Sequence, residues 1–197
     1  MKKLLAFLLS LLLLTGCAAN TQKEESIAEE PIAEEKVTES AEATAEPAYL
    51  GTFSAQTLTG ETLDQSFFAN ADLTVINVWA TYCGPCKREM PVLGVLDKEL
   101  ENVQVLGIVT DVINQNAEPD EAQVELALEL LAAYGCDYPN LILNQSLANL
   151  GFASLQAVPA TLFVDKDGKL VGMGFYGALD EENWRNTIDE RLELAQQ

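Results

Sequence analysis

The chain has 197 residues, of which 31 are acidic, 11 are basic and none is histidine, so its formal net charge is −20. This charge repels phosphate backbones, which argues against nucleic-acid binding. Without an imidazole the chain has no Ser-His-Asp or Cys-His nucleophilic site and no histidine-ligated metal or haem. Any chemistry must therefore use Cys, Asp, Glu, Lys or Tyr. The apolar fraction of 48% is enough for a buried core.

Residues 1–16 have the composition of a secretory signal peptide. Two lysines precede the segment 4–14, in which every residue except one serine is apolar. As a helix this segment would rise about 16 Å, too little for the roughly 30 Å core of a bilayer. The Leu-Thr-Gly-Cys that ends at Cys17 resembles a bacterial lipobox, which predicts that Cys17 is lipidated and becomes the mature N-terminus. An ordinary cleaved signal with an incidental cysteine is the alternative.

Residues 17–47 are expected to form a disordered acidic tether behind the lipidated Cys17. After this cysteine the segment holds nine glutamates, two lysines and no aromatic residue, with an Ile-Ala-Glu-Glu echo at Ile27 and Ile32. So few large apolar side chains cannot offset the entropy of ordering the chain. The predicted reach of such a tether is on the order of 30 Å.

Residues 48–197 are expected to form the folded domain, because short apolar runs alternate there with amphipathic stretches, as in α/β layer folds. The segment 49–68, with Gly60 in a turn, predicts an N-terminal β-hairpin. The segments 73–79 and 103–109 are nearly continuous apolar runs, which indicates two central parallel strands buried on both faces.

Two helices are expected in the middle of this domain. The first spans Gly84 to Leu100, between the two buried strands. The second is expected to start after Asp120, which can cap it, and to end at Gly135, a residue that suits the left-handed C-terminal position. The predicted apolar face of the second helix contains Val124, Leu128 and Leu131.

The C-terminal part predicts a second β-hairpin and a last helix. Strands at 160–164 and 169–175 flank an Asp-Lys-Asp-Gly turn. The helix is expected to start near Asp180 with an acidic first turn, and its apolar stripe comprises Trp184, Ile188, Leu192 and Ala195. The complete order predicts an α/β thioredoxin-like fold with an N-terminal β-hairpin and a central insertion.

The most informative segment is Trp-Ala-Thr-Tyr-Cys-Gly-Pro-Cys at 79–86, where a buried strand is followed by a helix. Two cysteines separated by two residues in a first helical turn are close enough to form a disulfide. Unpaired N–H groups at the helix N-terminus stabilise a thiolate, so Cys83 is expected to be the exposed, attacking sulfur. Cys86 is then the resolving thiol.

Three alternatives compete for this cysteine pair. A structural disulfide would close only a two-residue loop and would stabilise the fold little. A zinc site needs four ligands, whereas beyond Cys17 only Cys136 is left and histidine is absent. A peroxiredoxin would have proline seven residues and Thr or Ser three residues before its reactive cysteine. Ile76 and Ala80 stand there instead, which argues against direct peroxide chemistry.

Residues 79–91, the Val-Pro-Ala-Thr at 158–161 and the hairpin at 163–168 together resemble the TlpA/ResA-like thiol-disulfide oxidoreductases. These are membrane-tethered, extracytoplasmic members of the thioredoxin superfamily, and the resemblance covers about residues 48–195. It implies that Pro159 is a cis-proline lying against the disulfide and that the backbone of Val158 binds an extended substrate. An edge-strand or bulge proline is the alternative for Pro159.

The resemblance also implies a proton-transfer role for Glu89, three residues after Cys86. Thioredoxin has a buried aspartate six residues before its first cysteine, but Asn77 occupies that position here and cannot carry a proton. The alternative is a solvated glutamate in a Lys-Arg-Glu run, since glutamate is rarely buried. Both interpretations stay open at this point.

The remaining candidates are expected to have minor roles. Cys136 lacks a spaced partner, which predicts a free, partly buried thiol, with a regulatory or second resolving role as the alternative. Trp79 and Tyr82 are expected to pack around the site. Lys87 and Arg88 are expected to be ordinary solvated cations.

The sequence thus predicts an extracytoplasmic, lipid-anchored thiol-disulfide oxidoreductase that uses no cofactor and no metal. The Gly-Pro pair between the cysteines favours a reductant of protein disulfides. The implied partners are an oxidised client protein, a membrane thiol reductase as electron donor and the bacterial cell membrane, which the chain reaches through its lipid anchor as a monomer. The alternatives are a non-catalytic binding lipoprotein on a thioredoxin scaffold and a peroxiredoxin-like antioxidant.

Overall fold

The computed structural model describes residues 48–197. The predicted signal peptide, the lipidated Cys17 and the acidic tether lie outside the described residues. Within residues 48–197 no helix is both long and apolar enough to span a bilayer.

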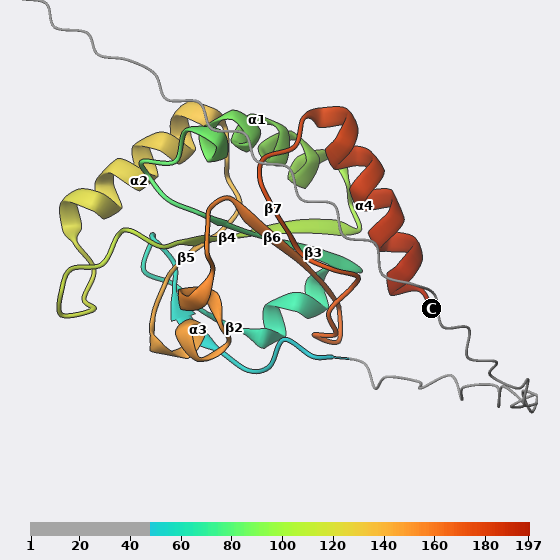
Figure 1. The fold of residues 1–197 in the computed structure, drawn as a ribbon, viewed down its shortest axis with the longest axis horizontal. Coiled ribbons are helices and arrows are strands. Elements are labelled where there is room, and N and C mark those ends of the chain that lie inside the picture. Colours follow the sequence, from blue (N-terminus) through green and yellow to red (C-terminus); the bar gives the residue numbers. More distant parts are fainter. Residues whose placement is uncertain (1–47) are drawn as a thin grey trace, which may run out of the picture. The chain divides into compact units, whose positions relative to one another are not determined.

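A five-stranded sheet in the order β5-β4-β3-β6-β7 forms the centre of the fold (Figure 1). Strands β3 (Leu73–Trp79) and β4 (Val103–Val109) are parallel and pair along their full length, as expected. Strand β5 (Asn140–Ile142) extends the parallel part, whereas β6 (Ala160–Asp165) and β7 (Phe175–Tyr176) are antiparallel to their neighbours. Every residue of β3 is buried, because both faces of the sheet are covered.

Three helices cover one face of the sheet, and they pack on alternate residues of β3, such as Val75 and Trp79. They are α1 (Gly84–Glu99), α2 (Glu121–Tyr134) and α4 (Glu181–Ala195). The other face, which includes Ile76 and Val78, packs against smaller elements. These are the hairpin of β1 (Ser54–Gln56) and β2 (Thr62–Asp64), the 3₁₀ helices η1 (Gln65–Asn70) and η2 (Phe152–Ser154), and α3 (Gln145–Asn149).

The helix ends follow the capping residues of the sequence. The Asp120 carboxylate accepts hydrogen bonds from the first turn of α2, and Gly135 ends α2 with a φ of +72°. Asp180 caps α4 in the same way. The predicted apolar face of α2 was wrong at one position: Leu128 is 36% exposed, and Ala127 is buried instead. Val124, Ala127 and Leu131 form the buried face of α2, and Leu128 lies at the edge of this face.

Both hairpins are present, but they are more irregular than the sequence indicates. In the first, Gly60 has a φ of +91° in the turn, whereas Phe68 lies in η1. In the second, the strand expected over 169–175 is regular only in β7, because two extra residues bulge between the Leu170 and Phe175 pairings. A glycine is required within this bulge, since a Cβ on Gly174 would lie 2.6 Å from the Thr161 carbonyl oxygen.

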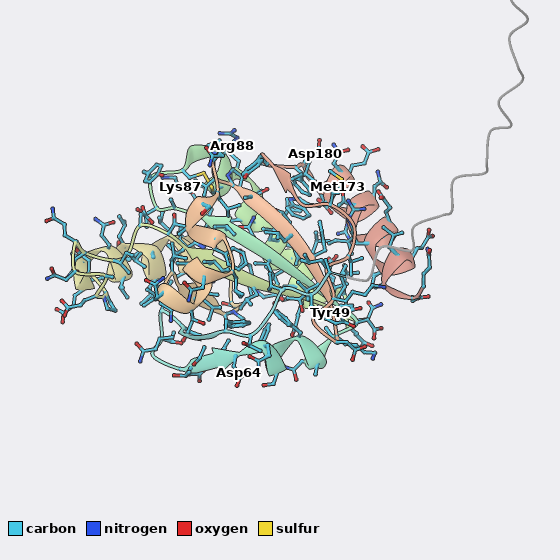
Figure 2. All side chains as sticks on the ribbon, turned by 60° about the horizontal axis from the view of Figure 1, so that its bottom comes forward. Tyr49, Asp64, Lys87, Arg88, Met173 and Asp180 are labelled. Carbon is cyan, nitrogen blue, oxygen red and sulfur yellow. A yellow bond between two sulfur atoms is a disulfide. The ribbon has the colours of Figure 1, made fainter. Side chains whose placement is uncertain are left out.

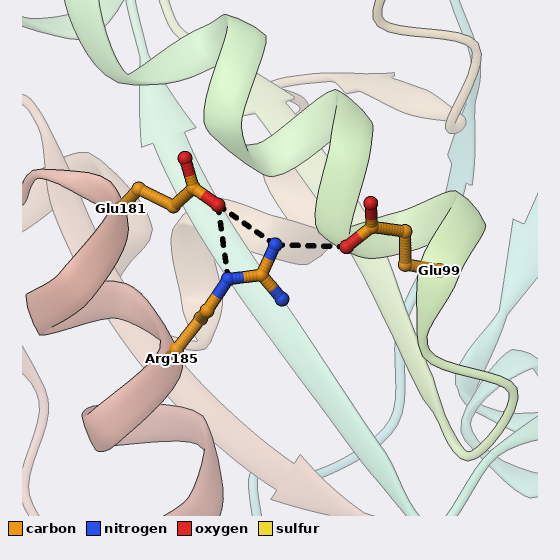
Figure 3. Close-up of polar contacts among 3 residues, drawn as sticks. All are labelled: Glu99, Glu181 and Arg185. Carbon is orange, nitrogen blue, oxygen red and sulfur yellow. Dashed lines mark hydrogen bonds and ion pairs between the residues drawn. The ribbon is translucent and has the colours of Figure 1, made fainter.

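Helices α1 and α4 lie side by side and are bridged at the surface by Arg185 (Figure 3). Its guanidinium donates to Glu181 one turn earlier in α4, at 2.8 and 3.0 Å, and to Glu99 at the end of α1, at 2.8 Å. Such exposed ion pairs contribute less than about 1 kcal/mol each. The buried contacts of Trp184 and Ile188 therefore supply most of the energy that holds α4 on the sheet.

The end of β3 is fixed by a buried hydrogen bond across two strands. The indole N–H of Trp79 donates to Asn140 Oδ1 at 2.8 Å, and the Asn140 amide donates to the Tyr138 carbonyl oxygen at 2.9 Å. The Asn140 side chain lies directly over Gly107 of β4, where any Cβ would overlap it. Glycine at this position thus makes room for the bond that orients Trp79.

We expect Gly107→Ala to lower the free energy of unfolding by about 2–4 kcal/mol, because the new methyl group displaces the acceptor of the Trp79 indole. Gly84→Ala is the matched control, since a Cβ there meets no atom closer than 3.9 Å. Chemical denaturation of both variants in the disulfide form measures the difference. Equal stability of the two variants would show that Asn140 can move aside without cost.

Candidate active site

The two cysteines lie where β3 gives way to α1. Cys83 is the N-cap residue of α1, with extended backbone angles, and Pro85 occupies the first turn, where its missing N–H costs no hydrogen bond. The Cys83 sulfur accepts a hydrogen bond from the backbone N–H of Cys86 at 3.1 Å. The sulfur thus takes the place of a capping side chain at the positive end of the helix dipole.

Cys83 and Cys86 form a disulfide, with an S–S distance of 2.00 Å and a Cα–Cα distance of 5.3 Å. Cys83 is 5% exposed and Cys86 is 1% exposed. The expectation that Cys83 is an exposed residue was therefore wrong. Cys83 is nevertheless the more accessible member of the pair.

The loop before Cys83 is held by Asp111, a residue that the sequence interpretation missed. The Asp111 carboxylate accepts hydrogen bonds from the Thr81 N–H, at 2.9 and 3.0 Å, and from the Thr81 hydroxyl, at 2.6 Å. The Lys87 ammonium donates to the Thr81 carbonyl oxygen at 3.1 Å. The position of Asp111 just after β4 could have predicted this contact, because β3 and β4 are parallel and the carboxyl ends of parallel strands meet at one edge of the sheet.

Glu89 is buried one helical turn beyond Cys86 and is only 1% exposed. Its carboxylate accepts hydrogen bonds from the Asn77 amide at 3.0 Å and from the Leu179 N–H at 3.3 Å. Burial raises the pKa of Glu89 from 4.5 to about 7, against the opposing effect of these two donors. The carboxyl group can therefore hold or release a proton near neutral pH.

Asn77 and Trp184 complete the surroundings of Glu89, and the sequence did not reveal either contact. Asn77 comes from β3 and is completely buried, as is Trp184 from α4. The indole of Trp184 faces the carboxylate, but within residues 48–197 its N–H forms no hydrogen bond. Asn77 Oδ1 is likewise without a partner. A polar residue inside an all-buried strand was the signal, because it requires a polar neighbour.

The Val158–Pro159 peptide bond is cis, and it directly precedes β6. Pro159 is buried and its carbonyl oxygen accepts from the Gly177 N–H at 2.9 Å. Val158 packs partly against the core cluster that contains both cysteines. Among the described residues, no hydrogen bond engages the backbone N–H or C=O of Val158.

A pocket of about 280 Å³ lies beside this segment, at the carboxyl ends of the parallel strands. Tyr82 and Val158 both line it, together with Thr110, Leu143 and Phe152. Tyr82 is 75% exposed, so the expectation that it packs around the site was wrong, whereas Trp79 is fully buried. Tyr82 is free to contact another molecule.

A larger pocket, of about 470 Å³, lies between the β1–β2 hairpin and α2 and is lined in part by Cys136. Neither Cys83 nor Cys86 borders it. Cys136 is a free, buried thiol that donates to the Met90 carbonyl oxygen at 3.3 Å. Burial raises the pKa of the Cys136 thiol, which makes it a poor nucleophile.

Lys87 and Arg88 lie beside the disulfide at the edge of the described domain (Figure 2). Neither of them forms an ion pair with a described carboxylate, unlike Lys98, Lys166, Arg185 and Arg191. The positive charge near the sulfurs is thus not neutralised by local partners.

Residues 48–197 hold no group of three or more His, Cys, Asp or Glu side chains placed to bind a metal.

Solved structures with a similar fold are thiol:disulfide interchange proteins and their homologues. One from Chlorobium tepidum superposes with a TM-score of 0.62 and 19% identity, covering 76% of this chain and 99% of that one. A DsbF homologue from Corynebacterium diphtheriae gives 0.59 and 21%, covering 73% and 87%. The pneumococcal exposed lipoprotein thioredoxin gives 0.52 and 24%, covering 71% and 99%. The expected thioredoxin-like fold is confirmed.

Curated relatives carry related names. The chain is 26% identical over 119 residues to the thiol-disulfide oxidoreductase ResA of Halalkalibacterium halodurans, covering 60% of each protein. It is 32% identical over 115 residues to the thiol:disulfide interchange protein DsbE of Pseudomonas fluorescens biotype C, covering 58% of this chain and 57% of that one. The match thus spans only about three fifths of each relative's length. The resemblance inferred from residues 79–91 and 158–168 is confirmed.

A family model described as the AhpC/TSA family matches residues 49–173, which include both cysteines, Glu89 and the cis-proline. This match covers more than half of the chain, and it includes α1 and every strand of the central sheet except β7. By fold and by sequence, the chain belongs to the AhpC/TSA family and has the thioredoxin-like architecture of the thiol-disulfide oxidoreductases that it resembles.

Proposed function

We propose that the chain is a thiol-disulfide oxidoreductase that reduces disulfides of client proteins outside the cytoplasm. The observation that carries this proposal is the Cys83–Cys86 disulfide at the N-terminus of α1, with a buried carboxyl group one turn further along the same helix. A disulfide that closes a two-residue loop adds little stability. A chemical role accounts better for its place at a helix terminus.

The reaction starts from the reduced pair. The Cys83 thiolate attacks one sulfur of the client disulfide, forms a mixed disulfide and releases the other client sulfur as a thiolate. The helix N-terminus, the Cys86 N–H and the nearby Lys87 and Arg88 all favour the negative charge on Cys83. Cys86 then attacks Cys83 Sγ, which frees the reduced client and restores the Cys83–Cys86 disulfide. Two electrons pass from the pair to the client.

Glu89 is proposed to take the proton of Cys86 during the second step. The Cys86 sulfur is buried, and burial disfavours the thiolate. A carboxyl group one turn away with a pKa of about 7 can accept this proton without a large energetic penalty. No histidine can take this proton instead of Glu89, because the chain contains no histidine.

The client is proposed to bind as an extended segment along Val158 and Pro159. The unengaged N–H and C=O of Val158 can pair with a client backbone in the manner of an added strand. The pocket beside Tyr82 and Val158 offers room for a neighbouring client side chain. The contact requires no cofactor.

Location and direction form part of the same proposal. The lipobox that ends at Cys17 supports a lipid anchor on the bacterial cell membrane, and this fold occurs in a lipoprotein of Streptococcus pneumoniae. A membrane thiol reductase would return electrons to the Cys83–Cys86 disulfide. The Gly84-Pro85 pair, which is also that of thioredoxin, favours reduction over oxidation of the client. The domain would act as a monomer.

Direct peroxide reduction is less well supported, although the family description is compatible with it. The positions three and seven residues before Cys83 are held by Ala80 and Ile76, both apolar and fully or almost fully buried. They offer no hydroxyl group to a peroxide. A purely binding role would leave both the cysteine pair and the buried Glu89 without a purpose.

We expect Cys86→Ser to accumulate a mixed disulfide with an oxidised client such as insulin, because Cys83 can attack and no thiol resolves the adduct. Cys83→Ser should form no adduct and should lose insulin reduction. Cys136→Ser is the control and should retain activity within about twofold, since its thiol bonds to the Met90 carbonyl oxygen and the pocket that it lines contains neither Cys83 nor Cys86. Adduct formation by Cys83→Ser would reverse the assignment of the two sulfurs.

We expect Glu89→Gln to slow client reduction by about ten- to a hundredfold and to change its pH profile, because glutamine cannot carry a proton. Glu99→Gln on the same helix is the matched control, since Glu99 makes only a surface ion pair. Steady-state rates between pH 5 and pH 9 provide the measurement. A wild-type profile in Glu89→Gln would exclude the shuttle.

The same residue predicts a pH dependence of stability. The raised pKa of Glu89 means that burial favours the protonated form, so its contribution is complete below pH 4.5 and is lost as the pH rises through about 7. Relative to Glu89→Gln, the disulfide form of the wild type should lose up to about 3 kcal/mol of unfolding free energy over that range. Urea denaturation at pH 5 and pH 8 tests this, and a constant difference would contradict it.

We expect Cys17→Ala to move the protein from the membrane fraction to the soluble fraction, because the lipid attaches to the Cys17 thiol. Fractionation of cells that express either form gives the answer. Retention of the variant on membranes would contradict the anchor and would leave the proposed chemistry untouched.

A further inference from the structure

Among the buried polar atoms without a hydrogen-bond partner in residues 48–197 are one acceptor and one donor from side chains around Glu89. The acceptor is Asn77 Oδ1 and the donor is the indole N–H of Trp184. Buried polar atoms without partners are rare in folded proteins and require an explanation. Here the two atoms belong to the two side chains that enclose one carboxyl group.

The two protonation states of a carboxyl group need different partners. An ionised carboxylate only accepts hydrogen bonds, whereas a protonated carboxyl group also donates one. The observed contact, from Asn77 Nδ2 to Glu89 Oε1, serves the ionised state. If Asn77 kept this orientation, a proton on Oε1 would meet the Asn77 N–H, and a proton on Oε2 would lie on the oxygen that accepts from the Leu179 N–H. Neither neighbour could accept the proton.

The Asn77 amide can meet both needs by turning over. A half turn about its last side-chain bond exchanges Oδ1 and Nδ2 with little change in shape. Among residues 48–197, Glu89 is the only side chain to which this amide donates, so the turn breaks no other bond there. Each orientation makes one hydrogen bond to the carboxyl group and leaves the other end of the amide unpaired.

We propose that Asn77 is a positioning residue whose amide turns over when Glu89 gains or loses its proton, so that the carboxyl group stays hydrogen-bonded in both states. This deepens the proposed role of Glu89 and rests on the proposed function only in assigning a use to the proton. An aspartate at position 77 could not replace Asn77, because an ionised aspartate has no N–H to donate.

The other groups that face Glu89 do not substitute for this amide. The Leu179 N–H, from the segment before α4, is a donor only and serves the ionised state. The indole N–H of Trp184, from α4, is likewise a donor only and cannot accept a proton from the carboxyl group. The Tyr138 phenol, in the segment before β5, lies near Glu89, and burial raises the pKa of this phenol. Its hydroxyl forms no hydrogen bond to Glu89. Cys86 on α1 does not titrate in the disulfide form.

Neutron diffraction from crystals of the wild-type disulfide form, held at pH 5 and at pH 9, tests the proposal directly, because it distinguishes an amide ND₂ group from an oxygen. At pH 9 the nitrogen of Asn77 should face Glu89. At pH 5 the oxygen should face it and accept a deuteron from the carboxyl group. One orientation at both pH values would overturn the proposal.

The titration of Glu89 in the disulfide form gives a second test, with the ¹³C carboxyl signal assigned by its loss in Glu89→Gln. Asn77→Leu removes a partner from both protonation states. Since charge-assisted bonds are only about twice as strong as neutral ones, the midpoint should rise by less than about one pH unit. A rise well above one unit would show that Asn77 serves only the ionised state and would overturn the proposal.

Thr74→Val is the matched control for the titration, because Thr74 is a buried polar residue of the same strand that bonds to Gln104 instead. It should leave the midpoint of Glu89 unchanged. Neither experiment depends on turnover. If the wild-type protein does not reduce clients but its Asn77 amide changes orientation between pH 5 and pH 9, the proposed function alone is contradicted. If the protein reduces clients but the amide keeps one orientation, the role of Asn77 alone is contradicted.

Discussion

The desolvation of one carboxyl group links the sheet, two helices and the chemistry of this protein. Glu89 is enclosed by Asn77 from β3, by Trp184 from α4 and by the Leu179 N–H just before that helix. An ionised carboxylate in such surroundings is costly unless donors surround it. The position of α4 on the sheet and the polar residue in β3 are both consistent with that requirement.

The sulfurs are held by a second set of contacts that comes from neighbouring strands. Asp111 after β4 fixes Thr81, and Asn140 in β5 fixes Trp79, so two strands brace the short loop that leads to Cys83. Such bracing reduces the conformational entropy that the loop could lose on binding a client. The backbone of Val158, by contrast, is left without partners in the described part of the chain. The groups that hold the loop before Cys83 are thus different from the backbone groups of Val158 that remain free to bind a client.

Charge acts locally in this protein. Residues 48–197 carry 22 acidic and seven basic side chains, a balance that would disfavour a thiolate if all charges acted equally. At physiological ionic strength the Debye length is about 8 Å, so distant exposed carboxylates are largely screened. Lys87 and Arg88 lie beside the disulfide, in the first turn and a half of α1. The helix N-terminus adds to their effect.

The sequence by itself determined the order of the main strands and helices, but not α3 or the 3₁₀ helices η1 and η2. It also determined the helix caps at Asp120, Gly135 and Asp180 and the cysteine pair at a strand-to-helix junction. These features depend on local periodicity, capping and turn chemistry, which are encoded within a few residues of one another. It also singled out Pro159 and Glu89, through a resemblance between motifs.

Only the tertiary structure decided which distant side chains meet. It chose between a solvated and a buried Glu89, brought Asn77 and Trp184 to it from positions 12 residues before and 95 residues after it, and exposed Tyr82 instead of packing it. It also placed Asp111 on Thr81 and put a bulge into the second hairpin. Pairing between strands and packing between layers join residues that are far apart in the chain, and neither periodicity nor composition specifies those contacts.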